Sequence, residues 1–138
     1  MLIKRFIYVH RESNARNMTK KEQLDSLLAD LRNSGGVEGA AVVSKDGLII
    51  ASLLDAGVDS DIFGAMSATM NGAAETAMGE LKKGMPDRVL VEAAAGKLIA
   101  VGAGENSILV VLSAPSSSLG MLLVEMKKTA ERVRELIG

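Results

Sequence analysis

Few residues of this 138-residue chain are of the types that perform acid–base, nucleophilic or metal chemistry. The sole histidine is His10, and without cysteines the chain has neither a thiolate nucleophile nor a sulfur ligand for a metal. The serines at 116–118 have no histidine or lysine placed to activate them, so we interpret them as a helix N-cap. Carboxylates with the D-x-D-x-D-G spacing of a calcium loop are absent. We therefore predict that the protein is not an enzyme and has no catalytic residues, metal site or cofactor.

Two glycine-containing stretches have some features of phosphate-binding loops. The stretch VVSKDGLII, residues 42–50, places Asp46-Gly47 between two apolar runs. Asp-Gly is favoured in a two-residue type I′ hairpin turn, whereas a phosphate loop joins a strand to a helix. Gly102-Ala103-Gly104 resembles half of a dinucleotide-binding fingerprint, but a strand pattern follows it and the third glycine is missing. Both stretches are therefore predicted to be connections between strands.

Composition argues against nucleic acid and membrane partners. The net charge is −1 and the aromatic content 2%, so the chain lacks both a cationic surplus for phosphates and aromatic platforms for bases. No apolar run approaches the roughly 18–20 residues that span a bilayer. The apolar stretch at residues 6–9 is short, and Lys4-Arg5 precede it, which does not fit a secretory signal. We predict a cytoplasmic protein without nucleic-acid binding or membrane insertion.

Three segments have helical patterns. Thr19 and Glu22 form a capping box, and a leucine stripe at i, i+3, i+4 and i+7 follows up to Asn33. A long helix is expected at about 60–83 and a third from the serine run to about 137. We therefore predict a domain at 18–138 and an N-terminal extension at 1–17. The extension is an accessory arm, an upstream extension of the reading frame, or a short strand at 2–9 that pairs with another segment.

Five segments have strand patterns, and the last four are apolar on both faces for most of their length. They are residues 37–44, 48–55, 88–95, 97–103 and 107–114. A strand that is apolar on both sides is usually covered on both sides. The sequence thus predicts an α+β fold, a three-layer α/β/α sandwich with a five-stranded antiparallel sheet and the order α-β-β-α-β-β-β-α. Two helices would cover one face of the sheet and one helix the other.

The long helix has two distinct arcs. The arc that we expect to face the core contains Ile62, Met66, Met70, Ala73, Ala77 and Leu81. The opposite arc carries small residues, namely Gly64, Ala65, Ala68, Gly72 and Gly79. A glycine inside a helix costs about 1 kcal/mol relative to alanine. Because close approach by another backbone would offset this cost, we predict that a second copy of the chain packs on the small-residue arc.

The element order, together with the run from Gly36 to Val43 that leads into Asp46-Gly47 and the strand Leu48–Ala51, resembles the Roadblock/LC7 family. The resemblance covers about residues 19–137. It implies a homodimer or heterodimer in which the long helices pair and the strand at 88–95 continues the sheet across a two-fold axis. It also implies a non-enzymatic scaffold or regulator, since prokaryotic stand-alone members resemble regulators of small Ras-like GTPases.

These patterns and the resemblance together predict a homodimer, and the resemblance implies that it binds a small Ras-like GTPase and modulates its nucleotide cycle. The predicted dimer interface consists of Gly64, Ala65, Ala68, Gly72, Gly79, Arg88, Leu90 and Glu92. The charges nearest the paired helices, Glu75, Lys82 and Lys83, are the predicted docking residues for the GTPase. The alternative is a ligand-sensing or general protein-interaction module of the same fold without a GTPase partner.

Overall fold

A computed structural model describes residues 17–138. The predicted N-terminal extension, with its alternative strand at 2–9 and with His10, lies outside this range apart from Asn17. The helices are α2 (Lys20–Arg32), α3 (Ser60–Glu80) and α4 (Leu119–Ile137). The strands are β1 (Val37–Ser44), β2 (Ile49–Leu53), β3 (Arg88–Ala93), β4 (Gly96–Gly102) and β5 (Ser107–Ser113). This order of elements is the predicted one.

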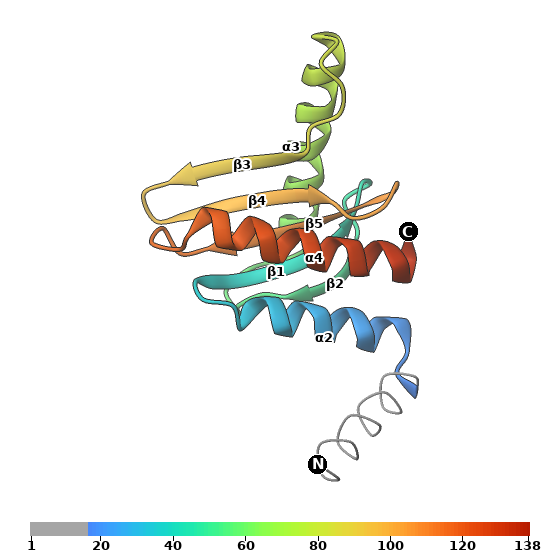
Figure 1. Cartoon of the computed structure of the whole chain (residues 1–138), viewed down its shortest axis with the longest axis vertical. Helices are drawn as coiled ribbons and strands as arrows, with labels where there is room; N and C mark the ends of the chain where they lie inside the picture. Colours follow the sequence, from blue (N-terminus) through green and yellow to red (C-terminus); the bar gives the residue numbers. More distant parts are fainter. Residues whose placement is uncertain (1–16) are drawn as a thin grey trace.

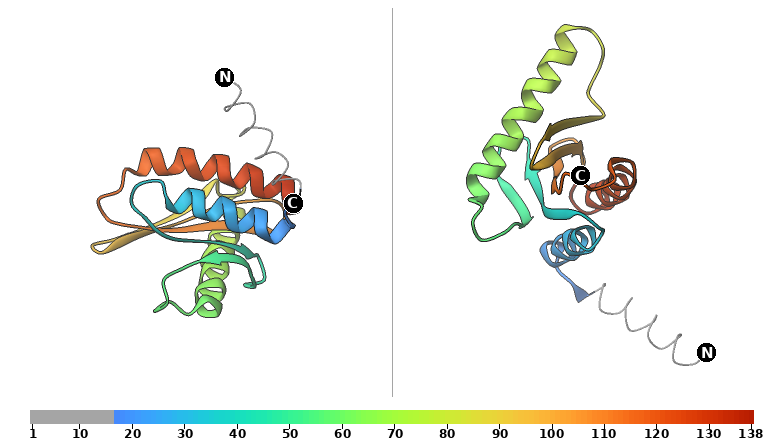
Figure 2. Two further views of the ribbon diagram at one scale, coloured as in Figure 1. Left: turned by 90° about the horizontal axis from the view of Figure 1, so that it is seen from below. Right: turned by 90° about the vertical axis from the view of Figure 1, so that its left-hand side faces the viewer.

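The five strands form one antiparallel sheet with the order β2-β1-β5-β4-β3. Helices α2 and α4 lie side by side on one face, and α3 crosses the other face (Figures 1 and 2). The predicted three-layer sandwich, with two helices on one face and one on the other, is thus confirmed. β2 and β3 are the two edge strands.

Each face of the sheet has its own hydrophobic core, which explains why the strands are apolar on both sides. Under α2 and α4, Leu28, Met126 and Val133 pack with strand residues such as Val42 and Leu109. Under α3, strand residues on the other face pack with partly buried helix residues; this smaller cluster includes Val43, Ile108, Val110, Phe63 and Met70. Alternation along β1 and β5 therefore sends apolar side chains to both cores.

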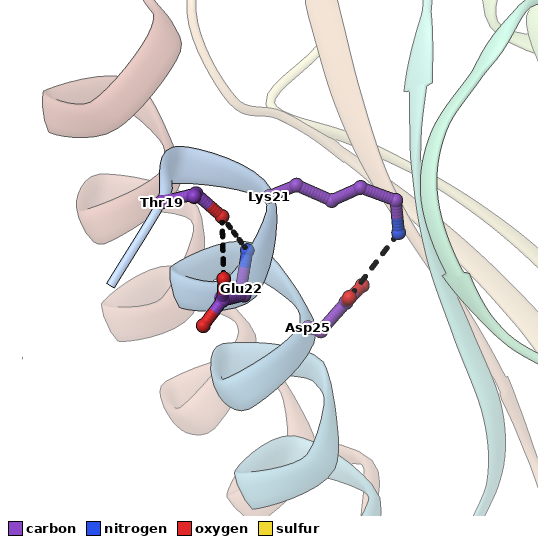
Figure 3. A network of polar contacts seen from close by, with 4 residues as sticks. All are labelled: Thr19, Lys21, Glu22 and Asp25. Atoms are coloured by element: carbon purple, nitrogen blue, oxygen red, sulfur yellow. Dashed lines mark hydrogen bonds and ion pairs between the residues drawn. The ribbon is translucent and has the colours of Figure 1, made fainter. Parts of the chain in front are cut away.

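Half of the predicted capping box is present at the start of α2 (Figure 3): the Thr19 side chain caps the helix, but the Glu22 carboxylate meets the Thr19 hydroxyl and not its backbone N–H. The Thr19 hydroxyl oxygen accepts a hydrogen bond from the Glu22 backbone N–H at 3.1 Å. The same hydroxyl donates to the Glu22 carboxylate at 3.2 Å, and Lys21 pairs with Asp25 one turn on, also at 3.2 Å. The side-chain cap replaces one of the hydrogen bonds that the first turn of a helix lacks.

The β1–β2 connection differs from the predicted type I′ turn. Such a turn needs positive φ at both central residues, but here Gly47 has φ 94° and Asp46 is not among the residues with positive φ. The Gly47 N–H donates to the Ser44 carbonyl at 2.9 Å, and the Ser44 N–H donates to the Leu48 carbonyl at 2.8 Å. The connection is thus a three-residue loop, Lys45 to Gly47, with the left-handed residue in last place. That position suits glycine, whereas Asp46 stays in an ordinary conformation.

Candidate interaction surface

Helix α3 is only partly supported by its own sheet. Its first half lies over the sheet, whereas its second half and the connection to β3 project beyond the sheet edge (Figures 1 and 2). The helix starts at Asp59, whose carboxylate accepts a hydrogen bond from the Ile62 N–H at 3.1 Å. From Thr76 to Met85, every residue except Met78 is exposed. A helix that extends into solvent in this way is typical of a part that another molecule covers.

The side of α3 that faces the sheet combines large apolar residues, Phe63 and Met70, with small and polar ones. Gly64, Ser67 and Asn71 are its buried members. A Cβ on Gly64 would stand 2.8 Å from the Gly47 carbonyl oxygen and 3.1 Å from Cδ1 of Ile49. The prediction that Gly64 packs on a second chain is therefore wrong, because its close backbone contact is with the β1–β2 loop of its own chain. Ala68 is half-buried beside the same loop.

Most of the predicted core arc of α3 is in fact its outer face; Met70 is the member of the arc that packs in the core under α3, as predicted. Ile62 is 61% exposed, Met66 66% and Leu81 66%, and Ala73 and Ala77 are exposed as well. The prediction exchanged the inner and outer faces of the helix because both are poor in charge. Periodicity alone cannot say which of two apolar faces lies inward. The reversal leaves large apolar side chains on the outside.

Of the other small residues predicted at the interface, three flank this outer face. Ala65 and Gly79 are exposed, and Gly72 is half-buried. Cβ atoms built on Gly72 and Gly79 would meet nothing within 4 Å. Their space is open in the single chain, so their contact with a second chain stays a prediction.

Edge strand β3 continues the apolar surface. It pairs with β4 only, and Leu90 and Val91 are 37% and 45% exposed. Leu90 lies opposite Ile99, a member of the core under α2 and α4, so Arg88, Leu90 and Glu92 share that side of the sheet. We use the name α3–β3 surface for the outer face of α3 together with β3 and their connection; its large apolar side chains are Ile62, Met66, Leu81, Met85, Leu90 and Val91.

The predicted docking residue Glu75 has partners within its own chain. Its carboxylate accepts a hydrogen bond from Asn71 Nδ2 at 3.0 Å and pairs with Lys45 Nζ at 3.1 Å. The Glu75 side chain is 25% exposed and that of Lys45 33%. This pair ties the middle of α3 to the β1–β2 loop, so Glu75 has a structural contact that is not apparent from the sequence.

The end of α3 also differs in detail from the expected stop at Gly84. Lys82 has φ 57°, and its N–H donates to the Gly79 carbonyl at 3.0 Å. The Lys83 N–H donates to the Met78 carbonyl, also at 3.0 Å. These are the two bonds of a Schellman motif, in which the left-handed residue is usually glycine. The helix thus ends at Glu80, and its left-handed residue comes two positions before Gly84. Both lysines are exposed beyond its last turn.

Two grooves of about 460 Å³ each flank the start of β3. One lies between β3 and the last turns of α3, and its lining includes Ala74, Ala77 and Met78. The other lies between β3 and α4, and its lining includes Lys127 and Arg134. Residues 17–138 contain no cluster of three or more His, Asp or Glu side chains that could hold a metal ion. Nor does any helix in the described part of the chain combine the length and apolarity needed to cross a membrane.

Comparison with solved structures defines the class of fold. A Roadblock/LC7 domain from Streptomyces avermitilis has a TM-score of 0.75 and 24% identity, covering 80% of this chain and 94% of that one. Myxococcus xanthus MglB has a TM-score of 0.78 and 18% identity, covering 83% of this chain and 94% of that one. At these identities the likeness concerns the fold, which is the α/β/α sandwich of Roadblock domains.

Sequence comparison gives the family. The model of the Roadblock/LC7 domain matches residues 23–113. Protein MJ1340 of Methanocaldococcus jannaschii is 39% identical over 113 residues, which are 82% of this chain and 98% of that protein. The chain belongs to the Roadblock/LC7 family.

Proposed function

We propose that the protein is a non-enzymatic homodimer that joins through the α3–β3 surface. The proposal rests on the large apolar side chains that are exposed on α3 and β3. The most exposed of them are Ile62, Met66 and Leu81, on α3 and its C-cap. Fully burying one such side chain contributes about 1.5–3 kcal/mol. An extended patch of this kind on a small soluble domain is typical of an interaction site.

The open edge of β3 supports a second copy of the chain as the molecule that covers the α3–β3 surface. An open edge strand with several exposed apolar residues can template pairing with another chain. The same surface on two copies can meet itself around a two-fold axis, which is the commonest symmetry of homo-oligomers. Membership of the Roadblock/LC7 family agrees with this arrangement. One similar solved structure shows MglB in a tetrameric arrangement, so assembly of several copies occurs on this fold.

We further propose that the dimer works in the cytoplasm, where it binds a small Ras-like GTPase and modulates its nucleotide cycle. The support is the family and the likeness of the fold to MglB from two bacteria. Lys82 and Lys83, exposed at the projecting end of α3, are the proposed docking residues of the dimer. Glu75 is a weaker candidate for docking, because its carboxylate already binds Lys45 and Asn71 within the chain.

The experiment for the GTPase is a titration of the purified protein into each small Ras-like GTPase encoded in the same genome. Release of a fluorescent guanine nucleotide and hydrolysis of GTP are both followed. We expect one GTPase to respond with a saturable change in one of these rates. Lys82→Glu/Lys83→Glu should weaken this response while the variant stays dimeric in sedimentation velocity. Lys127→Glu/Lys128→Glu, two exposed adjacent lysines on α4, is the matched control. If no GTPase binds although the protein is dimeric, the alternative, an interaction module without a GTPase partner, replaces this proposal.

A further inference from the structure

The family resemblance implies that β3 continues the sheet across the two-fold axis of a dimer. We propose the register of this antiparallel pairing, which is centred on Leu90. Arg88 of each chain then lies opposite the partner's Glu92, and Leu90 lies opposite the partner's Leu90. The inference rests on the proposed homodimer and goes beyond it, because it specifies which residues meet across the axis and the charges that select them.

The sequence of β3 is suited to self-pairing. The strand reads RVLVEA from Arg88 to Ala93. Around Leu90 the apolar residues are symmetrical, with Val89 on one side and Val91 on the other, and the outer pair consists of opposite charges. Residues that face each other in an antiparallel pair project to the same side of the sheet. A two-fold axis through Leu90 therefore makes an apolar centre with an Arg–Glu pair at each end.

Both charged side chains lack an ionic partner in the described part of their own chain. The ion pairs among residues 17–138 include neither Arg88 nor Glu92. Glu92 lies opposite Lys97 in β4. The Lys97 ammonium, however, donates to the carbonyls of Pro115 and Ser117 at 2.9 and 3.0 Å. The Glu92 carboxylate is thus left to pair across the open edge.

Other registers are less favourable. An axis through Arg88 or through Glu92 would place like charges directly opposite each other, which is destabilising. An axis through Val89 or Val91 would place a charged residue opposite Leu90. An axis between two residues would pair side chains from opposite faces of the sheet. The register centred on Leu90 is the one in which every directly opposed pair from 88 to 92 is complementary.

Charge exchange tests the register. We expect Arg88→Glu or Glu92→Arg alone to weaken the dimer by about tenfold to a hundredfold, because each replaces two attractive pairs with two repulsive ones. The double variant Arg88→Glu/Glu92→Arg restores both attractive pairs in exchanged order, and its dissociation constant should return to within about threefold of the native value. An equimolar mixture of the two single variants should form the heterodimer in preference to either homodimer. Sedimentation velocity measures the dissociation constants, native mass spectrometry identifies the heterodimer, and circular dichroism verifies that each variant is folded.

Cross-linking gives a second test that does not depend on charge. Because the native chain has no cysteine, Leu90→Cys supplies one thiol per chain. At the axis, its Cα should lie about 4.5–5.5 Å from that of its counterpart, within the range of a disulfide. The matched variant Val91→Cys on the same strand should form far less disulfide, because residue 91 would lie opposite residue 89.

The results separate the register from the homodimer itself. A native protein that is dimeric, but whose double charge variant stays as weak as the single variants, would overturn the register. Equal cross-linking of Leu90→Cys and Val91→Cys would also overturn it. A native protein that is monomeric throughout would instead overturn the proposed homodimer, and the register with it.

Discussion

The Cα of Gly64 in α3 lies so close to the β1–β2 loop that a methyl group on it would stand 2.8 Å from the carbonyl oxygen of Gly47. Gly47 has φ 94°, and a Cβ on it would lie 3.3 Å from the Cα of Ala65. Two glycines thus let a helix and a hairpin loop meet backbone to backbone. This contact determines how α3 lies on the sheet and which of its faces points outward.

We expect Gly64→Ala to lower the free energy of unfolding by about 1–3 kcal/mol, because the added methyl forces backbone apart and repacks Ile49. Gly72→Ala in the same helix should keep or raise stability by up to about 1 kcal/mol, because its methyl meets nothing within 4 Å and alanine is the better helix former. Urea unfolding at one fixed protein concentration measures both. Equal losses in the two variants would contradict the intrachain contact of Gly64.

Lys82→Gly should stabilise the protein by about 1 kcal/mol, because the left-handed backbone at φ 57° is costly for a residue with a side chain. Lys83→Gly, which removes the same charge one residue on, should give no gain, since Lys83 is not among the residues with positive φ. Thermal and urea unfolding of the two variants checks this difference. If both variants changed in stability by a similar amount, the cause would be the lost charge and not the left-handed backbone at the end of α3.

The pair of Lys45 and Glu75 should show a favourable coupling of about 0.5–1 kcal/mol in a double-mutant cycle with alanine. The expected value is modest because both side chains keep some contact with water, at 33% and 25% exposure. Glu75→Ala alone should cost more than Lys45→Ala alone, because it also leaves Asn71 without its acceptor. Additive single effects would mean that the ion pair does not hold α3 to the β1–β2 loop.

Met66→Glu should raise the dissociation constant of the dimer by about a hundredfold or more, because it places a carboxylate in an apolar interface. Met121→Glu is the matched control: Met121 on α4 is 67% exposed and Met66 on α3 is 66% exposed. We expect the control to leave the dimer unchanged, since α4 lies on the other face of the sheet. Sedimentation velocity over a range of concentrations distinguishes the two. Dissociation by Met121→Glu with no effect of Met66→Glu would place the interface on the α2–α4 side.

Much of this fold could be predicted from the sequence, because local signals and global packing agree. Thr19 and Glu22 marked the start of α2, and strands that are apolar on both sides marked a sheet between two layers of helices. The turn at Asp46-Gly47 was located correctly, but its type was not. Loop length depends on where β1 and β2 stop pairing, and the irregular register after Val42 is not visible in the sequence.

The candidate site was only partly predictable. The sequence indicated that α3 has more apolar and small surface than one core needs, and a second chain was inferred from it. It could not distinguish the inner face from the outer one, because glycine at 64 suits close contact with either a partner or the chain's own loop. Met66 and Leu81 were assigned to the core for the same reason. The sequence alone indicates a free surface charge at Glu75. Its partner Lys45 is distant in the sequence and comes close to it only in the folded chain.

The most direct test of the central claim is the mass of the native chain in solution, measured by light scattering and sedimentation from sub-micromolar to about 100 µM. The polypeptide has a mass of 14.4 kDa. We predict a species with twice this mass that dissociates on dilution, together with a shift toward the monomer for Met66→Glu and none for Met121→Glu. A single species with the mass of one chain at every concentration would contradict the homodimer and the function proposed for its α3–β3 surface.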